Sequence, residues 1–211
     1  MLQMNSVKAK RINERQKLKM DKIRSLGGNK RLAILRLDQF SQVHCLRSRR
    51  EAERKGTIHL LQLLFGDVGW DLVYLSNGKP VVRGVRGGIS ISHSHDVLGI
   101  LHDSDRSHTG LDIELIREKV LKIRYKFLSE KEKKFIPDDN VKMHIMAWCA
   151  KETLYKIHSE GMLDFIQHLH LHDFSENDES VFGACTAPDF AFEKELRVEQ
   201  IENYIMTWPV N

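Results

Sequence analysis

Two acidic residues lie close together in the stretch TGLDIELI. Asp112 and Glu114 alternate there with Leu111, Ile113 and Leu115. Because residues i and i+2 of a strand share a face, the two carboxylates should project together while the apolar side chains point into the core. Such close charges repel each other unless the face is open to water or a cation lies between them, and oxygen ligands of this kind suit Mg²⁺. The pair alone is also typical of an exposed strand face.

A third acid follows in the stretch MAWCAKETLYK, which has the composition of a helix. Trp148, Glu152 and Lys156 are spaced i, i+4 and i+8, so they line one side of that helix, and Lys151 lies beside them. A carboxylate next to a lysine and an aromatic ring would complete a metal and phosphate site. The alternative is an ordinary Glu–Lys pair on a helix surface.

The stretch SISHSHD places Ser92 and His93 at the end of a predicted strand, where side chains and backbone N–H groups could meet phosphate. His93 and His95 could instead be structural or bind zinc, but the sequence offers no cysteine or third histidine at zinc-site spacing. Three further histidines alternate on another predicted strand, where an exposed strand face is favoured over a transition-metal site: His168, His170 and His172.

The elements that must position these residues follow from apolar periodicity and turn residues. In the first half of the chain we expect a strand over 32–37, a helix over 48–65 closed by Gly66, a strand over 72–75, a turn over 76–80, a glycine-containing loop over 84–88, and strands over 89–92 and 97–101. A polar connector over 103–109 leads to the acidic strand over 111–115.

In the second half, a helix is predicted over 118–127, and Ser129 with Glu132 forms a capping box for another helix. A strong helix over 143–158, ended by residues 160–161, precedes four predicted strands, over 167–172, 180–185, 190–194 and 197–201. This order predicts an α+β protein of two similar halves related by pseudo-two-fold symmetry, each a helix packed on a small antiparallel sheet.

Positive charge is concentrated at the start of the chain. The net charge is +4 over 211 residues, but residues 1–31 carry ten basic and two acidic residues, which leaves the remaining chain at −4. We therefore divide the chain into a basic arm over 1–30 and two halves over 31–106 and 107–211. The arm is expected to form a solvated or frayed helix over 5–26, and binding to an acidic partner is the alternative. No run of about 18 apolar residues is present, which excludes a membrane-spanning helix. Three widely spaced cysteines favour a reducing, cytoplasmic setting without a disulfide framework.

Taken in order along the chain, several stretches resemble the 4′-phosphopantetheinyl transferase superfamily, in particular its two-half, surfactin-synthetase-activating type. They are NGKP at 77–80, ISISHSHDVLGI at 89–100, GLDIE at 110–114, FLSEKE at 127–132 and WCAKETLYK at 148–156. The resemblance covers roughly residues 48–175. It implies a holo-[acyl-carrier-protein] synthase type of transferase, which moves the phosphopantetheine group of coenzyme A to a serine of an apo acyl or peptidyl carrier protein and releases adenosine 3′,5′-bisphosphate. It also implies a fold of two α+β halves with the active site between them.

The resemblance implies roles for the acidic strand and the helix. Asp112 and Glu114 match Mg²⁺ ligands, and Glu152 matches the carboxylate that completes the metal site and is often assigned as general base. Lys156 matches a lysine on the pyrophosphate. Such a lysine and a metal ion would neutralise the charge of a pyrophosphate under attack.

The resemblance also implies contacts to coenzyme A. Lys79 and Pro80 match a loop beside the adenine and ribose, whereas Ser92 and His93 match contacts to the nucleotide phosphates. Further motif residues near the same site are Trp148 and Lys151, and Glu132 matches an acid whose role stays open.

One position departs from the family pattern. Ile58 stands where such proteins usually carry an arginine that helps bind the nucleotide's phosphate, and Arg54, Lys55 or His59 could substitute for it. The departure favours one alternative, a pseudo-enzyme that binds coenzyme A or a carrier protein without transfer. A second is a Mg²⁺-dependent phosphodiesterase or nuclease steered by the basic arm. A third, a structural interaction module, leaves the clustered carboxylates unexplained.

We expect a monomer that binds an acidic carrier protein through a basic patch, and no nucleic-acid or membrane partner. Two sets of residues could supply the patch: Arg47, Arg49, Arg50, Arg54 and Lys55 in the first half, or Lys122, Arg124 and Lys126 in the second. The sequence does not choose between them.

Overall fold

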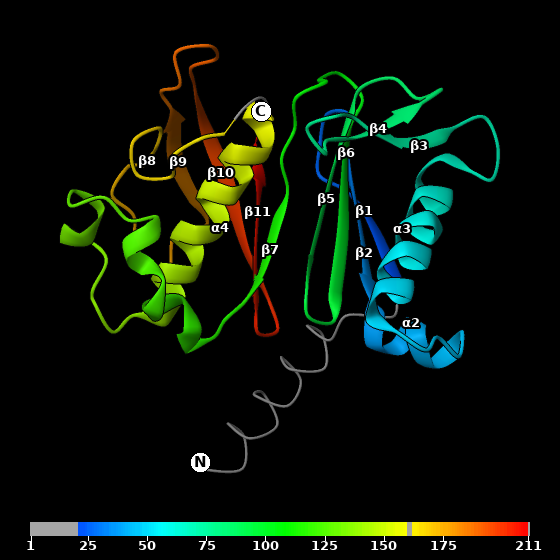
Figure 1. The fold of residues 1–211 in the computed structure, drawn as a ribbon, viewed down its shortest axis with the longest axis horizontal. Coiled ribbons are helices and arrows are strands. Elements are labelled where there is room, and N and C mark those ends of the chain that lie inside the picture. The colour runs from blue at the N-terminus through cyan, green and yellow to red at the C-terminus, as the bar shows by residue number, and fades with distance from the viewer. Residues whose placement is uncertain (1–20, 160–161, 211) are drawn as a thin grey trace, which may run out of the picture.

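The computed structural model describes residues 21–159 and 162–210, which form two antiparallel sheets side by side, each with a helix on its outer face (Figure 1). The sheet of the N-terminal half has the strand order β1-β2-β6-β5. Its strands are β1 (Asp21–Ser25), β2 (Lys30–Arg36), β5 (Gly88–Ser94) and β6 (Val97–Asp103), and the short helix α2 (Leu37–Val43) follows β2 directly.

Helix α3 (Arg49–Phe65) covers the N-terminal sheet. Ser48 caps its start by accepting a hydrogen bond from the Glu51 backbone N–H at 3.2 Å, and Gly66 follows its last residue. Its buried face packs on Leu35, Leu98 and other apolar residues of the sheet. A hairpin of β3 (Asp71–Tyr74) and β4 (Pro80–Arg83) follows α3 and stands against the end of β5.

The sheet of the C-terminal half has the order β7-β11-β10-β9-β8. Its strands are β7 (Asp112–Leu115), β8 (Leu169–Leu171), β9 (Ser180–Cys185), β10 (Phe192–Ile201) and β11 (Tyr204–Pro209), and α4 (Val141–His158) packs on it. The Asn140 side chain caps α4 by accepting from the Met143 N–H at 2.9 Å. Twelve of the eighteen residues of α4 are buried, so this helix is the centre of its half. Neither α4 nor any other described helix is long and apolar enough to cross a membrane.

The two sheets meet along β5 and β7, which are the facing edge strands and lie side by side (Figure 1). A cluster of buried side chains drawn from both halves fills the junction: Leu32, Ile34, Val97, Leu101, Leu111, Ile113, Tyr204, Met206 and Trp208. Gly99 of β6 permits this close approach, because a Cβ atom there would lie 2.6 Å from Cδ1 of Ile113. The halves therefore share a core, and the acidic strand runs along their junction.

The α+β class is confirmed, as are the helix closed by Gly66, the strands around residues 32–36, 72–74 and 97–101, and the strand Ser180–Cys185. The strong helix is confirmed from Val141 to His158, while its predicted end at 160–161 lies outside the described residues. Pseudo-two-fold symmetry and the division at residue 107 stay predictions.

Several predicted elements are wrong. The segment 118–127 forms two short 3₁₀ turns, Glu118–Lys122 and Arg124–Lys126, instead of one helix, although Val120 is buried and Leu121 and Ile123 pack against the same core. The predicted capping box does form, since Ser129 and Glu132 exchange hydrogen bonds of 2.8 and 3.3 Å, but only a 3₁₀ turn follows it.

The described end of the predicted arm helix is the strand β1, which pairs with β2; residues 1–20 lie outside the described part of the chain. The sequence analysis also missed α2, β4 and β11, and it split β10 into two strands. Strand β11 is buried along its whole length, so it lacks the alternation by which a half-exposed strand is recognised.

Candidate active site

A row of serine side chains joins β5 to β7 at the junction of the halves. Ser90, Ser92 and Ser94 point toward β7, and their hydroxyl oxygens accept hydrogen bonds from the backbone N–H groups of Leu111, Ile113 and Leu115 at 2.9, 3.2 and 3.2 Å. The row satisfies edge N–H groups that have no strand partner on this side. The alternation of serine in SISHS thus forms the seam that positions the acidic strand.

Asp112 is the most enclosed of the three predicted carboxylates, with 4% of its surface exposed. Its Oδ1 accepts from the Ser92 hydroxyl at 2.9 Å and from the Lys156 ammonium at 2.8 Å. Its Oδ2 is buried and has no hydrogen-bond partner in the described part of the chain. A buried carboxylate oxygen without a partner is costly, and a cation would satisfy it.

Glu114 is half-buried beside Asp112 and is held at both oxygens. Its Oε1 accepts from the Trp148 ring N–H at 3.1 Å, and its Oε2 accepts from the Ser94 hydroxyl at 3.1 Å. The Trp148 ring is itself fixed by stacking on Phe165, with centroids 5.3 Å apart. Burial, and then the Asp112 charge, raise the pKa of Glu114 above its ordinary value.

Glu152 reaches the same place from α4. Burial, and then the Asp112 charge, raise its pKa to about 7; the Lys156 ammonium opposes this rise, and the Glu114 charge adds to it. The charges of the three carboxylates, on β7 and α4, therefore influence one another. Lys156, one turn further along α4, also donates to the Leu111 carbonyl at 2.9 Å, so it ties the helix to the start of the acidic strand.

The three acids fit a divalent cation chemically, because they offer oxygen ligands, an orphaned Oδ2 and two raised pKa values that a nearby positive charge would lower. Their arrangement here is not that of a closed site. Within residues 21–159 and 162–210, no three His, Cys, Asp or Glu side chains are placed so that they could hold one metal ion together.

The structure explains why glycine occupies position 110, at the start of the stretch GLDIE. A Cβ atom at this position would collide with the Thr153 carbonyl oxygen of α4. Glycine therefore allows β7 to lie directly against the helix that carries Glu152 and Lys156.

Lys151 does not take the ligand-binding place that was predicted for it. Its side chain is fully buried, and its ammonium donates to the Phe127 carbonyl at 2.6 Å, the Phe165 carbonyl at 2.9 Å and Glu132 Oε2 at 2.8 Å. Glu132 in turn accepts from the Leu171 backbone N–H at 2.9 Å. All three ammonium donors are used inside the protein, so Lys151 and Glu132 tie α4 to the loops around it.

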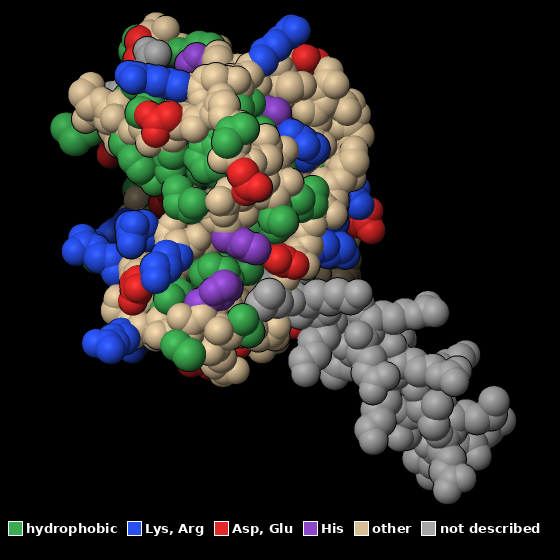
Figure 2. Space-filling view, turned by 90° about the vertical axis from the view of Figure 1, so that its right-hand side faces the viewer, with side chains coloured by type: hydrophobic (Ala, Val, Ile, Leu, Met, Phe, Trp, Pro, Cys, Tyr) green, Lys and Arg blue, Asp and Glu red, His purple; other side chains and the backbone are tan. Residues whose placement is uncertain are grey.

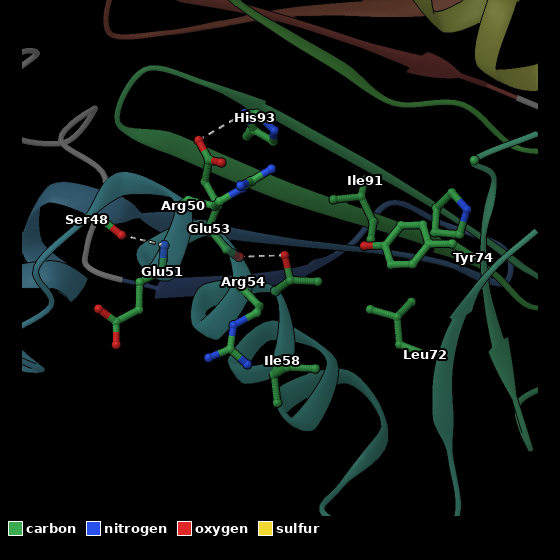
Figure 3. Close-up of a pocket in the computed structure, with 13 residues that line it drawn as sticks. Ser48, Arg50, Glu51, Glu53, Arg54, Ile58, Leu72, Tyr74, Ile91 and His93 are labelled. Carbon is green, nitrogen blue, oxygen red and sulfur yellow. Dashed lines mark hydrogen bonds and ion pairs between the residues drawn. The ribbon is translucent and has the colours of Figure 1, made fainter.

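The larger of two cavities beside the seam, of about 950 Å³, lies between α3, the β3–β4 hairpin and β5 (Figure 3). Leu72 and Tyr74 form one wall, and His93 and Arg54 lie on the side of the helix. Ile58 is 37% exposed and lines the same cavity, so the position that departs from the family pattern faces a space that could hold a ligand.

Positive charge at the larger cavity comes from Arg50 and Arg54, one turn apart on α3. Among the described residues, neither guanidinium has a hydrogen-bond or ion-pair partner. Figure 2 shows Lys and Arg side chains gathered along one edge of this face, next to a hollow with hydrophobic side chains above it. His93, half-exposed at the same cavity, lies 3.5 Å from Glu53.

The smaller cavity, of about 230 Å³, lies between the turn of the β3–β4 hairpin and α4 and includes Lys79, Pro80 and Lys156. The Lys79 ammonium donates to the Ser159 hydroxyl at 2.9 Å, which bridges the halves. The Thr109 hydroxyl in its wall is buried and lacks a hydrogen-bond partner in the described structure. Pro80 lines both cavities, so they adjoin, and Lys156 links the smaller one to Asp112.

The structure thus brings Asp112, Glu114, Glu152, Trp148 and Lys156 together, and Lys79, Pro80 and His93 line the adjoining cavities. Ser92 was predicted to contact the nucleotide phosphates, but its buried hydroxyl donates to Asp112 and accepts from the Ile113 N–H. The histidines of β8 and its flanks lie elsewhere, at the opposite edge of the C-terminal sheet: His168, His170 and His172.

Comparison with known protein families gives a match over the C-terminal half of the chain. The model of the family described as the 4′-phosphopantetheinyl transferase superfamily matches residues 108–209. The C-terminal half is similar to that superfamily. The match supports a transferase of the phosphopantetheinyl kind, and it includes the three carboxylates and all of α4. It leaves out β5 and α3. No curated protein matches the chain.

Sequence reasoning missed Ser94 and Thr109, and it named Arg50 only as part of a possible docking patch. The serines carried a signal, since SISHS alternates polar residues in an otherwise apolar strand. Thr109 carried none, and nothing in the sequence placed Arg50 at a cavity, because distant elements form the cavities around both residues.

Proposed function

We propose that this protein transfers the 4′-phosphopantetheine group of coenzyme A to a serine of an apo acyl or peptidyl carrier protein, with Mg²⁺, as a two-half enzyme of the surfactin-synthetase-activating, holo-[acyl-carrier-protein] synthase type. The observation that carries the proposal is the convergence of Asp112, Glu114, Glu152 and Lys156 at one seam beside two adjoining cavities. The family match over the half that holds these residues supports it.

In this reaction the serine oxygen forms a bond to the β-phosphorus of coenzyme A, the bond from that phosphorus to the bridging oxygen breaks, and adenosine 3′,5′-bisphosphate leaves. Asp112, Glu114 and Glu152 would hold the Mg²⁺, which supplies neutralisation of the pyrophosphate charge when bound. Lys156 would turn its ammonium from Asp112 toward the same phosphates. Glu152 would accept the serine proton as the general base of the transfer.

The two cavities would receive the nucleotide end of coenzyme A. Lys79 and Pro80 lie where the turn of the hairpin meets α4, and His93 lies in the larger cavity near Arg54. An apolar wall suits a base, while an unpaired guanidinium suits a phosphate. Arg54 would replace the phosphate-binding arginine that proteins of the family usually carry at the position of Ile58.

The acceptor would be an acidic carrier protein, for which the exposed arginines at the start of α3 offer a complementary surface: Arg47, Arg49, Arg50 and Arg54. We propose in addition that the enzyme acts as a cytoplasmic monomer in lipid or peptide biosynthesis.

The test is the mass of an apo acyl carrier protein after incubation with this protein, coenzyme A and Mg²⁺. A gain of one phosphopantetheine group is expected, and it should vanish with a chelator and with Asp112→Asn. Asp173→Asn is the matched control, because Asp173 is exposed just after β8, at the other edge of the sheet. No gain with several unrelated carriers would contradict the proposal.

The exposed Ile58 in the larger cavity favours one second candidate, a pseudo-enzyme that binds coenzyme A or a carrier protein without transfer. Calorimetric titration separates the two. Binding of coenzyme A without any transfer would support the pseudo-enzyme, whereas binding with transfer would exclude it.

A further inference from the structure

The serine seam of β5 does more than join two sheets, because two of its members also contact the proposed metal ligands. A serine hydroxyl has one hydrogen to donate and two lone pairs, so it can accept a backbone N–H and donate to a carboxylate at the same time. Ser92 does this between Ile113 N–H and Asp112, and Ser94 does it between Leu115 N–H and Glu114.

Ser90 also accepts a backbone N–H, but unlike Ser92 and Ser94 it does not donate to a carboxylate in the described part of the chain. It accepts from the Leu111 N–H at 2.9 Å, just before β7, and the residue preceding Leu111 is Gly110, which carries no carboxylate. The seam therefore contains an internal comparison: one serine that joins the strands alone, and two that join the strands and orient an acid.

We propose that Ser94 is a positioning residue for Glu114, so that the N-terminal half completes the carboxylate site of the C-terminal half. The inference rests on the proposed function, since it concerns the metal ligand role of Glu114. Ser94 and Trp148 hold the two oxygens of this carboxylate from opposite halves of the protein, at 3.1 Å each. Without the hydroxyl, one oxygen loses its donor and the carboxylate can rotate about its last bond.

Ser94 tests this idea more cleanly than Ser92. Asp112 Oδ1 accepts from both Ser92 and Lys156, so loss of the Ser92 hydroxyl leaves a charged donor in place. Glu114 Oε2 accepts from Ser94 as its one hydrogen-bond donor in the described structure. Ser94 is also buried, with 6% of its surface exposed, so water replaces its hydroxyl poorly.

The variants are Ser94→Ala, Ser90→Ala and Ser94→Thr. The first two each remove a hydroxyl that accepts a backbone N–H of the neighbouring segment, and only Ser94→Ala also removes a hydrogen bond to Glu114. The third keeps the hydroxyl. Mn²⁺, which prefers the same oxygen ligands as Mg²⁺, is the probe, and its affinity is measured by electron paramagnetic resonance. The Mg²⁺ concentration for half-maximal transfer to an apo carrier protein is the second readout.

Ser94→Ala is expected to weaken Mn²⁺ binding about tenfold and to raise the half-maximal Mg²⁺ concentration similarly, as is usual when a partner of a metal ligand is lost. Ser90→Ala should lower the melting temperature as much as Ser94→Ala does while leaving Mn²⁺ affinity within about twofold of wild type, and Ser94→Thr should restore the affinity.

Equal Mn²⁺ affinities and equal Mg²⁺ requirements in Ser94→Ala and wild type would overturn the positioning role and leave the proposed function standing. A similar loss of Mn²⁺ affinity in Ser90→Ala would also overturn it, since the seam alone would then account for the effect. A wild-type protein that neither binds Mn²⁺ nor performs transfer would overturn the proposed function and this inference with it.

Discussion

Replacing Glu152 by glutamine should stabilise the metal-free protein at alkaline pH, although it should abolish transfer. In the folded protein the pKa of Glu152 is raised from 4.5 to about 7 by burial and by the Asp112 charge. The folded state thus holds a proton on this group at pH values where the unfolded chain has released it. Stability is therefore lost as the pH rises from 4.5 through 7, because ionised Glu152 is unfavourable beside its neighbours.

The magnitude follows from the size of that change. Each pKa unit corresponds to about 1.4 kcal/mol, so a rise from 4.5 to about 7 costs about 3 kcal/mol of unfolding free energy at pH 8. Glutamine has nearly the shape of the protonated acid and cannot ionise. Glu152→Gln should therefore gain up to about 3 kcal/mol at pH 8, or roughly 6–12 °C in melting temperature for a chain of this size, and little at pH 4.

Urea unfolding of wild type and variant in the presence of a chelator, at pH 4, 6 and 8, measures the difference. Glu193→Gln is the control, because Glu193 is exposed on β10 and its replacement should change stability by less than about 0.5 kcal/mol. Mg²⁺ with coenzyme A should reverse the order by stabilising wild type more than the variant. A stability difference that does not grow between pH 4 and pH 8 would refute the electrostatic account of Glu152.

Three further predictions concern the surroundings of the site. Lys151→Met leaves the Glu132 charge buried without its partner and should cost about 3–5 kcal/mol in urea unfolding; a loss below about 1 kcal/mol would contradict the role of the buried pair. Gly110→Ala forces a methyl group against the Thr153 carbonyl and should lower stability by about 1–3 kcal/mol, so an unchanged melting temperature would show that β7 can move away from α4. Ile58→Arg adds a cation to the larger cavity and should tighten coenzyme A binding about tenfold in calorimetric titration; unchanged affinity would mean that the phosphates bind elsewhere.

The sequence predicted the residues of the candidate site better than their environment. Asp112, Glu114, Glu152 and Lys156 could be grouped because strand and helix periodicities are local properties, set by two and 3.6 residues per repeat. The same reasoning placed the Lys151 side chain at the site. Helical spacing puts it next to the site residues in the chain, but only the packed core shows that it points to Phe127 and Phe165 instead.

Some helices and strands could likewise be predicted from the sequence, and others could not. Helix α4 was predictable because the stretch MAWCAKETLYK has the composition of a helix and places Trp148, Glu152 and Lys156 on one side of it. The segment 118–127 was not, since it forms short 3₁₀ turns even though Val120, Leu121 and Ile123 pack on the core of its half. Strand β11 was missed because its place inside the sheet, between β7 and β10, buries both of its faces and removes the polar alternation that marks other strands.

By itself, the sequence determined the α+β class, the facing carboxylates of the acidic strand, and the glutamate and lysine of α4, since each depends on neighbours along the chain. The tertiary structure alone decided how the halves meet. It placed the hydroxyl groups of β5 against the carboxylates of β7, formed two cavities from α3, the β3–β4 hairpin and α4, and buried Lys151 in the core. These features depend on residues that are distant in the chain, and their contacts exist only once both sheets have packed together.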